Sequence, residues 1–134
     1  MWAGTTKSRV FPFDLQLRQK SPFYLTAPAA VMAYGAGYLW ATVPGADAVA
    51  RYDPRTNSVV TNNAGHRPAG LVVAHGSVFV ASNTDHHLIV LAPRTGAPVG
   101  APLRVPDNPL AVAAGAGHVW VSGIGSNAVS RIDY

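Results

Sequence analysis

One sequence motif recurs along the whole chain, and this repeat limits the folds that the chain can adopt. Three segments align with one another: 30–42 (AVMAYGAGYLWAT), 70–82 (GLVVAHGSVFVAS) and 111–122 (AVAAGAGHVWVS). Each begins shortly after a proline, and each has a glycine three residues before a large aromatic residue. A repeat of this length indicates an architecture in which similar units stack side by side and share one core.

The spacing of the aromatic residues defines the length of the unit. Trp2, Trp40, Phe79 and Trp120 lie 38, 39 and 41 residues apart. The second halves of the units align as well, at 47–57, 86–96 and 127–134, and 9–14 supplies a partial copy. The sequence therefore predicts one continuous segment, 1–134, made of two complete units and two partial ones: 1–27 (partial), 28–67, 68–108 and 109–134 (partial).

Each unit carries the pattern of four short antiparallel strands. The run after each proline, such as 70–74, is nearly all apolar and suits a strand buried on both faces. A glycine-containing turn follows, then the aromatic run, then an alternating run such as 48–53 that ends in a proline turn. The last run, such as 58–62, is polar, as an outer edge strand should be.

Four antiparallel strands in about 40 residues form one blade of a β-propeller. We therefore predict an all-β fold, a partial β-propeller of about 3.5 four-stranded antiparallel blades with about 14 strands. Closed propellers have at least four blades. We expect the chain to be a segment of a longer propeller, and the alternative is that two or more copies assemble head to tail into a ring.

Composition narrows the possible functions. The charged fraction is only 12%, and the net charge of +4 comes from single basic residues without a cluster, so we expect no nucleic-acid partner. The chain has no Cys, which excludes disulfides, thiol catalysis and Cys-type zinc sites. All six carboxylate side chains are Asp, which excludes an acid–base mechanism based on Glu. We expect no cofactor.

Two uncharged stretches, 23–46 and 109–130, are long enough to cross a bilayer. Each contains proline and several glycines, and each belongs to the repeat, whose middle copy includes His75 and Asp85. We therefore predict no membrane span. The N-terminus also lacks the basic start and apolar run of a signal peptide.

The repeat predicts where a binding site would lie. In a propeller, the loops between the second and third strands and the connectors between blades emerge on one face, around the central channel. The segments 42–47, 82–87 and 124–127, with the connectors 62–67 and 107–108, map to that face. We expect a small molecule or a protein to bind there, through Asp47, Arg67, His87, Asp107, Asn108 and Asn127.

The segment 83–87, Asn-Thr-Asp-His-His, has the most reactive side chains on this face. Together with the neighbouring connectors, it offers a candidate catalytic base, His66 or His86. Asp85 or Asp107 would orient that histidine. The interpretation that the sequence favours is a polar hairpin loop without catalytic chemistry. Adjacent histidines on a strand point to opposite sides, so we expect no metal site.

The pattern Pro…Ala-Gly-x-Val-Trp-Val…Asn-x-Val-Ser-Arg-Ile-Asp resembles the YVTN/NHL-type repeats of bacterial β-propellers. Streptogramin-lyase-like proteins and the extracellular propeller domains of bacterial receptor kinases look similar. The resemblance covers the whole chain and implies an extracellular or periplasmic location.

Two functions follow from this resemblance. The favoured one is a non-enzymatic scaffold that binds a ligand or a protein. The alternative is a fragment of a streptogramin-lyase-like enzyme that opens a lactone ester by elimination. The lyase pattern combines His with Glu at the channel mouth, and this chain has no Glu.

Overall fold

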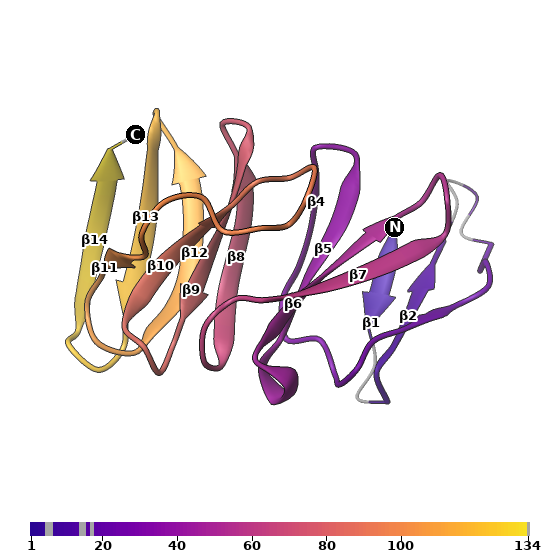
Figure 1. Cartoon of the computed structure of the whole chain (residues 1–134), viewed down its shortest axis with the longest axis horizontal. Helices are drawn as coiled ribbons and strands as arrows, with labels where there is room; N and C mark the ends of the chain where they lie inside the picture. Colours follow the sequence, from indigo (N-terminus) through magenta and orange to yellow (C-terminus); the bar gives the residue numbers. More distant parts are fainter. Residues whose placement is uncertain (5–6, 14–15, 17, 134) are drawn as a thin grey trace.

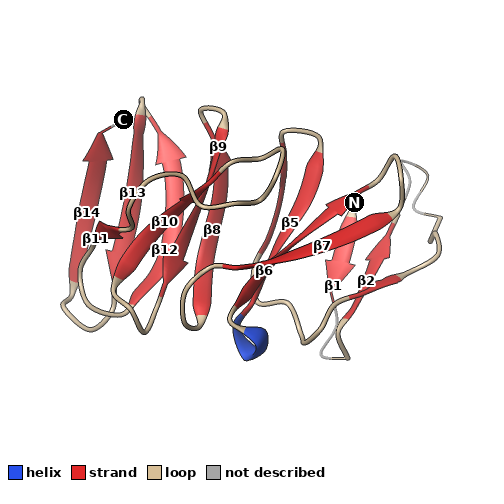
Figure 2. Cartoon of the chain, in the orientation of Figure 1, coloured by secondary structure: helices blue, strands red, loops and turns tan. Residues whose placement is uncertain are grey.

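The computed structural model describes residues 1–4, 7–13, 16 and 18–133. Fourteen strands form four antiparallel sheets, and a single 3₁₀ turn, η1 (Pro44–Ala46), is the helical element among these residues (Figures 1 and 2). The all-β class and the number of strands are as predicted. The last residues of two aligned copies, Asp14 and Tyr134, lie outside the described residues.

The four sheets follow the order of the chain, and we number them accordingly. Sheet 1 contains β1 (Trp2–Gly4), β2 (Arg9–Pro12) and β3 (Phe23–Tyr24). Sheet 2 contains β4 (Met32–Gly35), β5 (Tyr38–Val43), β6 (Ala48–Asp53) and β7 (Ser58–Asn63). Sheet 3 contains β8 (Pro68–Ala74), β9 (Ser77–Ser82), β10 (His87–Leu91) and β11 (Leu103–Arg104). Sheet 4 contains β12 (Pro109–Gly115), β13 (His118–Gly123) and β14 (Ala128–Asp133).

The first hairpin of sheets 2, 3 and 4 closes through a two-residue turn. Both central residues have a positive φ in each case, which is the type I′ geometry whose twist matches that of the flanking strands. Glycine supplies the second position, as the sequence predicts, and an ordinary residue adopts the left-handed conformation at the first. The pairs are Ala36 and Gly37 (φ 53° and 84°), His75 and Gly76 (49° and 75°), and Ala116 and Gly117 (52° and 78°).

Consecutive sheets pack face to face, and the recurrent aromatic residue lies between them. Trp40 from sheet 2 is fully buried against Val78 and Val80 of sheet 3. Phe79 from sheet 3 packs in the same way against Val119 and Val121 of sheet 4. The prediction that these aromatic residues wedge between neighbouring blades is therefore confirmed at both positions.

The outer faces of the two terminal sheets differ from these packed interfaces. Trp120 occupies the position of Trp40 and Phe79 in the repeat, yet 39% of its surface is exposed. Val129 beside it is 67% exposed. At the other end, Tyr24 of sheet 1 is 65% exposed, and Met1, which precedes β1, is 71% exposed. Within the described part of the chain, no further sheet covers either face.

Candidate functional site

The loops that were predicted to form one face do lie at one edge of the sheets. The 3₁₀ turn η1 and the turns β9–β10 and β13–β14 all lie at the lower edge in Figure 1, where β8 and β12 begin. Backbone hydrogen bonds join the turns to the connectors, from Asn83 N to Arg67 O (3.2 Å) and from Ile124 N to Asn108 O (3.1 Å). We call this edge the loop face: residues 44–47, 64–67, 83–86, 105–108 and 124–127.

Two side chains at equivalent positions of the repeat accept hydrogen bonds from the backbone of the connectors. Asp47 and His86 both have a left-handed backbone (φ 51° and 58°). Asp47 Oδ1 accepts a hydrogen bond from the backbone N–H of Arg67 (2.8 Å), and His86 Nδ1 accepts one from that of Asn108 (3.0 Å). Each contact holds the residue just before the first strand of the next sheet, so both side chains stabilise the connection between sheets.

The carboxylate of Asp85 accepts three hydrogen bonds from His66 and Ser82. Its Oδ2 accepts hydrogen bonds from the backbone N–H of His66 and from Ser82 Oγ, each at 2.7 Å. Its Oδ1 lies 2.8 Å from His66 Nδ1. A Cβ on Gly65 would collide with Ser82 and Asp85, so glycine permits this close approach.

This arrangement changes the acidity of both partners. The backbone hydrogen bond from His66, followed by that from Ser82, lowers the pKa of Asp85 to about 2. The hydrogen bond and the charge of Asp85 raise the pKa of His66. A carboxylate that accepts several hydrogen bonds is stabilised in its charged form, and a neighbouring negative charge favours protonated imidazole.

The pair has the geometry of a base held by a carboxylate. When neutral His66 donates from Nδ1 to Asp85, Nε2 keeps its lone pair, and the imidazole is 69% exposed. No other residue in the described part of the chain hydrogen bonds to Nε2. The positions equivalent to Asp85 in sheets 2 and 4 hold Ala46 and Ser126, so this pair occurs in one blade and is not part of the repeat.

A hollow lies where the first strands of sheets 2, 3 and 4 begin. Its inner part, of about 280 Å³, is almost entirely apolar, and an adjoining part of about 330 Å³ reaches the loop face. Ala30, Ala69 and Leu110 line both parts. We call the two parts together the axial hollow, lined by Ala30, Val31, Pro44, Arg67, Pro68, Ala69, Gly70, Leu71, Asn83, Leu110, Ala111, Val112 and Ile124.

Small residues bring the walls of this hollow together. A Cβ on Gly70 would collide with the backbone of Leu110 and Val112, so only glycine allows β8 to approach β12 this closely. Thr42 Oγ1 donates a hydrogen bond to the carbonyl of Ala69 (2.9 Å), which joins sheet 2 to sheet 3 at the same level. These contacts fix the positions of the walls of the hollow. Leu110 and Ile124 are exposed at its rim.

The structure brings some of the predicted site residues together and leaves others apart. Asp47 contacts Arg67, and Asp85 contacts His66. Asp107 Oδ1 lies 3.8 Å from both His86 Nδ1 and Arg104 Nη2. His87 begins β10 and is half-buried, and Asn127 is exposed in its turn; in the described residues neither side chain hydrogen bonds to the others.

The sequence placed Ser82 and Asn83 on the predicted face but gave neither a role; both support the loop face, from the end of β9 and the turn that follows. Asn83 Nδ2 donates to the carbonyl of Pro109 (3.0 Å). The sequence analysis did not find the axial hollow, although the small residues after each recurrent proline were a signal for it.

Among the described residues, no group of three or more His, Cys, Asp or Glu side chains is placed to hold a metal ion. No helix in the same residues is long and apolar enough to cross a membrane.

No protein-family model and no curated protein sequence matches the chain. Solved structures do match it. Streptogramin B lyase superposes with a TM-score of 0.78 at 16% identity, over 95% of this chain and 45% of the lyase. A catalytically inactive histidine-to-alanine variant of virginiamycin B lyase from Staphylococcus aureus, solved with quinupristin, matches with a TM-score of 0.73 at 14% identity, over 94% and 48%. The WD40 repeats of RRP9 match with a TM-score of 0.72 at 15% identity, over 98% and 47%.

The chain thus spans about half the length of these structures. They include a lyase and a WD40-repeat protein, so the likeness defines the fold and leaves the choice between enzyme and scaffold to the site. The four packed antiparallel sheets, the repeat and these superpositions lead to one conclusion: the chain has the fold of a partial β-propeller.

Proposed function

We propose that this chain is a non-enzymatic binding segment of a β-propeller, which holds a small ligand in the axial hollow. One observation carries the proposal: the first strands of three consecutive sheets converge on a single apolar hollow that opens on the loop face. Ligand sites in proteins are typically concave and apolar, with a few polar groups that fix orientation.

The residues around the hollow define the chemistry of the ligand. Val31, Leu110 and Ile124 offer exposed apolar surface, so the body of the ligand should be apolar. Arg67 lies at the mouth, and its guanidinium suits a carboxylate, sulfonate or similar anion. We therefore expect an amphipathic ligand with a ring or chain in the hollow and an anionic group at the loop face.

The described sheets surround only part of the axial hollow. Closed propellers need at least four blades and surround their channel on every side. Further blades, from a longer chain or from other copies of this one, would complete the wall around the ligand. A protein partner on the loop face is compatible with this arrangement, because Asp107, Asn108 and Asn127 remain exposed there.

The test uses 1-anilinonaphthalene-8-sulfonate, an apolar ring system with one anionic group, titrated against the chain by fluorescence. Val31→Ser should weaken binding about 5-fold or more, because it removes apolar wall from the hollow. Val99→Ser is the matched control, since Val99 is also an exposed valine but lies outside the hollow. Equal affinities of the two variants would contradict the proposal.

Arg67 is tested separately with the same probe. Arg67→Gln should weaken binding of the sulfonate more strongly at low salt than at high salt, because ionic attraction at the surface is screened by salt. A neutral analogue without the sulfonate should bind both proteins equally. Loss of both probes would mean that Arg67 supports the structure and does not recognise the anion.

A second candidate function follows from the His66–Asp85 pair. In an elimination, His66 Nε2 would take a proton from the carbon next to the bond that breaks, a C=C bond would form, and the ester C–O bond would break to leave a carboxylate. One of the similar solved structures is a streptogramin B lyase, and another is a catalytically inactive histidine-to-alanine variant of virginiamycin B lyase. This supports the alternative only by analogy of fold.

Quinupristin separates the two functions. The binding proposal expects no conversion of quinupristin by the chain, measured by liquid chromatography and mass spectrometry. Conversion that is lost in His66→Ala and kept in the control His75→Ala would support the lyase and overturn the non-enzymatic proposal.

A further inference from the structure

Sheet 4 repeats a set of three side chains that sheet 2 uses to bind its neighbour. In sheet 2, the rings of Tyr38 and Trp40 lie 6.1 Å apart at 75°, and Arg51 is the cross-strand partner of Trp40. In sheet 4, His118 and Trp120 lie 6.1 Å apart at 82°, and Arg131 is the partner of Trp120. The two sheets therefore present the same edge-on ring pair and the same arginine on the same face.

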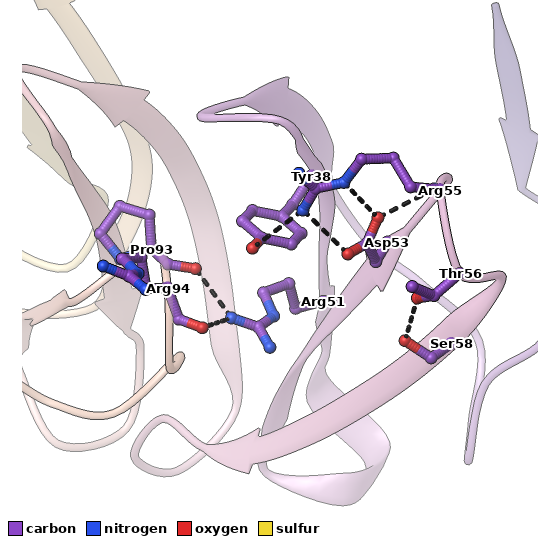
Figure 3. Close-up of polar contacts among 8 residues, drawn as sticks. All are labelled: Tyr38, Arg51, Asp53, Arg55, Thr56, Ser58, Pro93 and Arg94. Atoms are coloured by element: carbon purple, nitrogen blue, oxygen red, sulfur yellow. Dashed lines mark hydrogen bonds and ion pairs between the residues drawn. The ribbon is translucent and has the colours of Figure 1, made fainter.

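The contacts of sheet 2 show what this set of side chains binds. Arg51 reaches across to sheet 3, where its Nη1 donates to the carbonyls of Pro93 (2.9 Å) and Arg94 (Figure 3). The same guanidinium stacks 4.5 Å from the centre of the Tyr38 ring. Trp40 is fully buried in the apolar face of sheet 3. The occupant is thus a β-sheet with an apolar face and a turn that offers backbone carbonyls.

The same face of sheet 4 is open. Trp120 and Val129 are 39% and 67% exposed, and Arg131 Nε pairs with Asp133 of its own strand (3.1 Å). Its equivalent, Arg51, uses its guanidinium to contact the next sheet. A face that carries an exposed tryptophan, an exposed valine and an arginine is typical of an interaction surface.

The chain also carries the complementary open face, on sheet 1. Side chains alternate along β2, so that Val10 points into the core between sheets 1 and 2 and Phe11 points outward. Tyr24 pairs with Arg9, two residues before Phe11, so it lies on the same outer face, where it is 65% exposed. The equivalents of Phe11 in the next two sheets, Ala50 and Ile89, are buried. At the equivalent face of sheet 3, Ile89 packs in the core that receives Trp40.

We propose that the outer face of sheet 4 docks onto the outer face of sheet 1 in a second copy of this chain, and that two copies form one closed ring. Two copies bring eight sheets, which is within the range of four to eight blades that closed propellers have. A two-fold axis through the ring makes the two interfaces identical. Both open faces are then buried, and the second copy supplies the missing wall of the axial hollow.

Sedimentation equilibrium and light scattering of the 134-residue chain test the proposal, with an expected mass of twice 14.0 kDa. Val129→Lys should weaken association ~30-fold or more, the effect expected for a change at the centre of an interface. Val99→Lys, a matched change of an exposed valine outside both faces, should leave the mass unchanged. A monomer at all concentrations would overturn the proposal and would mean that the face belongs to further blades of a longer chain.

A second pair of measurements fixes the direction of docking. Tyr24→Lys alone should also yield monomers, and mixing it with Val129→Lys should restore a two-chain species, because the mixture keeps one intact interface. If Tyr24→Lys still forms dimers while Val129→Lys does not, two sheet 4 faces pair with each other and sheet 1 is not the occupant. Binding of the anilinonaphthalene probe is measured separately, so failure of docking is distinguished from failure of the proposed ligand site.

Discussion

Trp40 and Trp120 occupy the same position of the repeat and have different surroundings. Trp40 is fully buried between sheets 2 and 3, whereas Trp120 is 39% exposed on the outer face of sheet 4. Each lies beside a ring at the same distance and opposite an arginine on the neighbouring strand. The comparison shows that the repeat specifies a face that can bind a sheet, and that the neighbour decides whether the face is buried.

The largest expected effect tests this comparison directly. Trp40→Ala should lower the free energy of unfolding by about 3–5 kcal/mol, the usual result of removing a buried tryptophan. Trp120→Ala should cost less than half as much in the monomer, because part of its surface already contacts water. Urea unfolding at concentrations below association measures both. Equal losses would show that the face of sheet 4 is as well packed as that of sheet 2.

The next effect concerns the inner strands. Gly70→Ala should destabilise the protein by about 2–3 kcal/mol, because the added Cβ would collide with the backbone of Leu110 and Val112. Gly115→Ala is the control in the equivalent strand of sheet 4, where a Cβ meets no atom within 4 Å. It should change stability by about 0.5 kcal/mol or less. Thermal unfolding measures the stability of both variants. Equal losses of stability would contradict the close approach of β8 and β12.

The sequence was informative where short-range pattern decides the structure. The spacing of Trp40, Phe79 and Trp120 and the glycine turns predicted the strands, because these signals lie within single hairpins. It did not predict that Asp47 and His86 accept the N–H groups of Arg67 and Asn108. Those contacts depend on left-handed backbone at both partners and on the distance between separate segments.

The axial hollow and the complete set of contacts around Asp85 were not predicted, for a similar reason. The pairing of His66 with Asp85 was considered as one of several combinations, but the role of Ser82 follows only from the shape of its turn. The hollow exists because Gly70 and Ala69 let separate sheets approach one another. The predicted site residues His87 and Asn127 carried no signal to distinguish them from their neighbours, and their role in binding stays a prediction.

The two kinds of contact on the loop face give a third prediction. Asp85→Ala should cost about 1–3 kcal/mol, because it leaves the backbone N–H of His66 without its acceptor and removes the shorter of the two hydrogen bonds that the Ser82 hydroxyl makes. Asp47→Ala should cost about 1 kcal/mol, since it removes a single acceptor. Chemical denaturation compares them. A larger loss for Asp47 would mean that the repeated contact matters more than the contact found in one blade.

The smallest effect is the pH dependence of the His66 contact. Asp85 raises the pKa of His66, so protonation favours the folded state. The stabilisation is complete below the ordinary histidine value of 6.5 and is lost as pH rises through the raised value. His66→Gln should therefore lower the melting temperature more at pH 5.5 than at pH 8.5. A larger loss for His66→Gln at pH 8.5 than at pH 5.5 would contradict the sign.

Among the described residues, each sheet packs only against its neighbours in the chain, and this packing has a consequence for slow motions. Amide hydrogens of β5 and β9 should exchange with solvent most slowly, because they lie in sheets covered on both faces. The two terminal sheets, sheets 1 and 4, should open before these in a single copy, in the way that terminal repeats of linear arrays fray. Since β12 of sheet 4 forms one wall of the axial hollow, opening of sheet 4 in a single copy removes that wall.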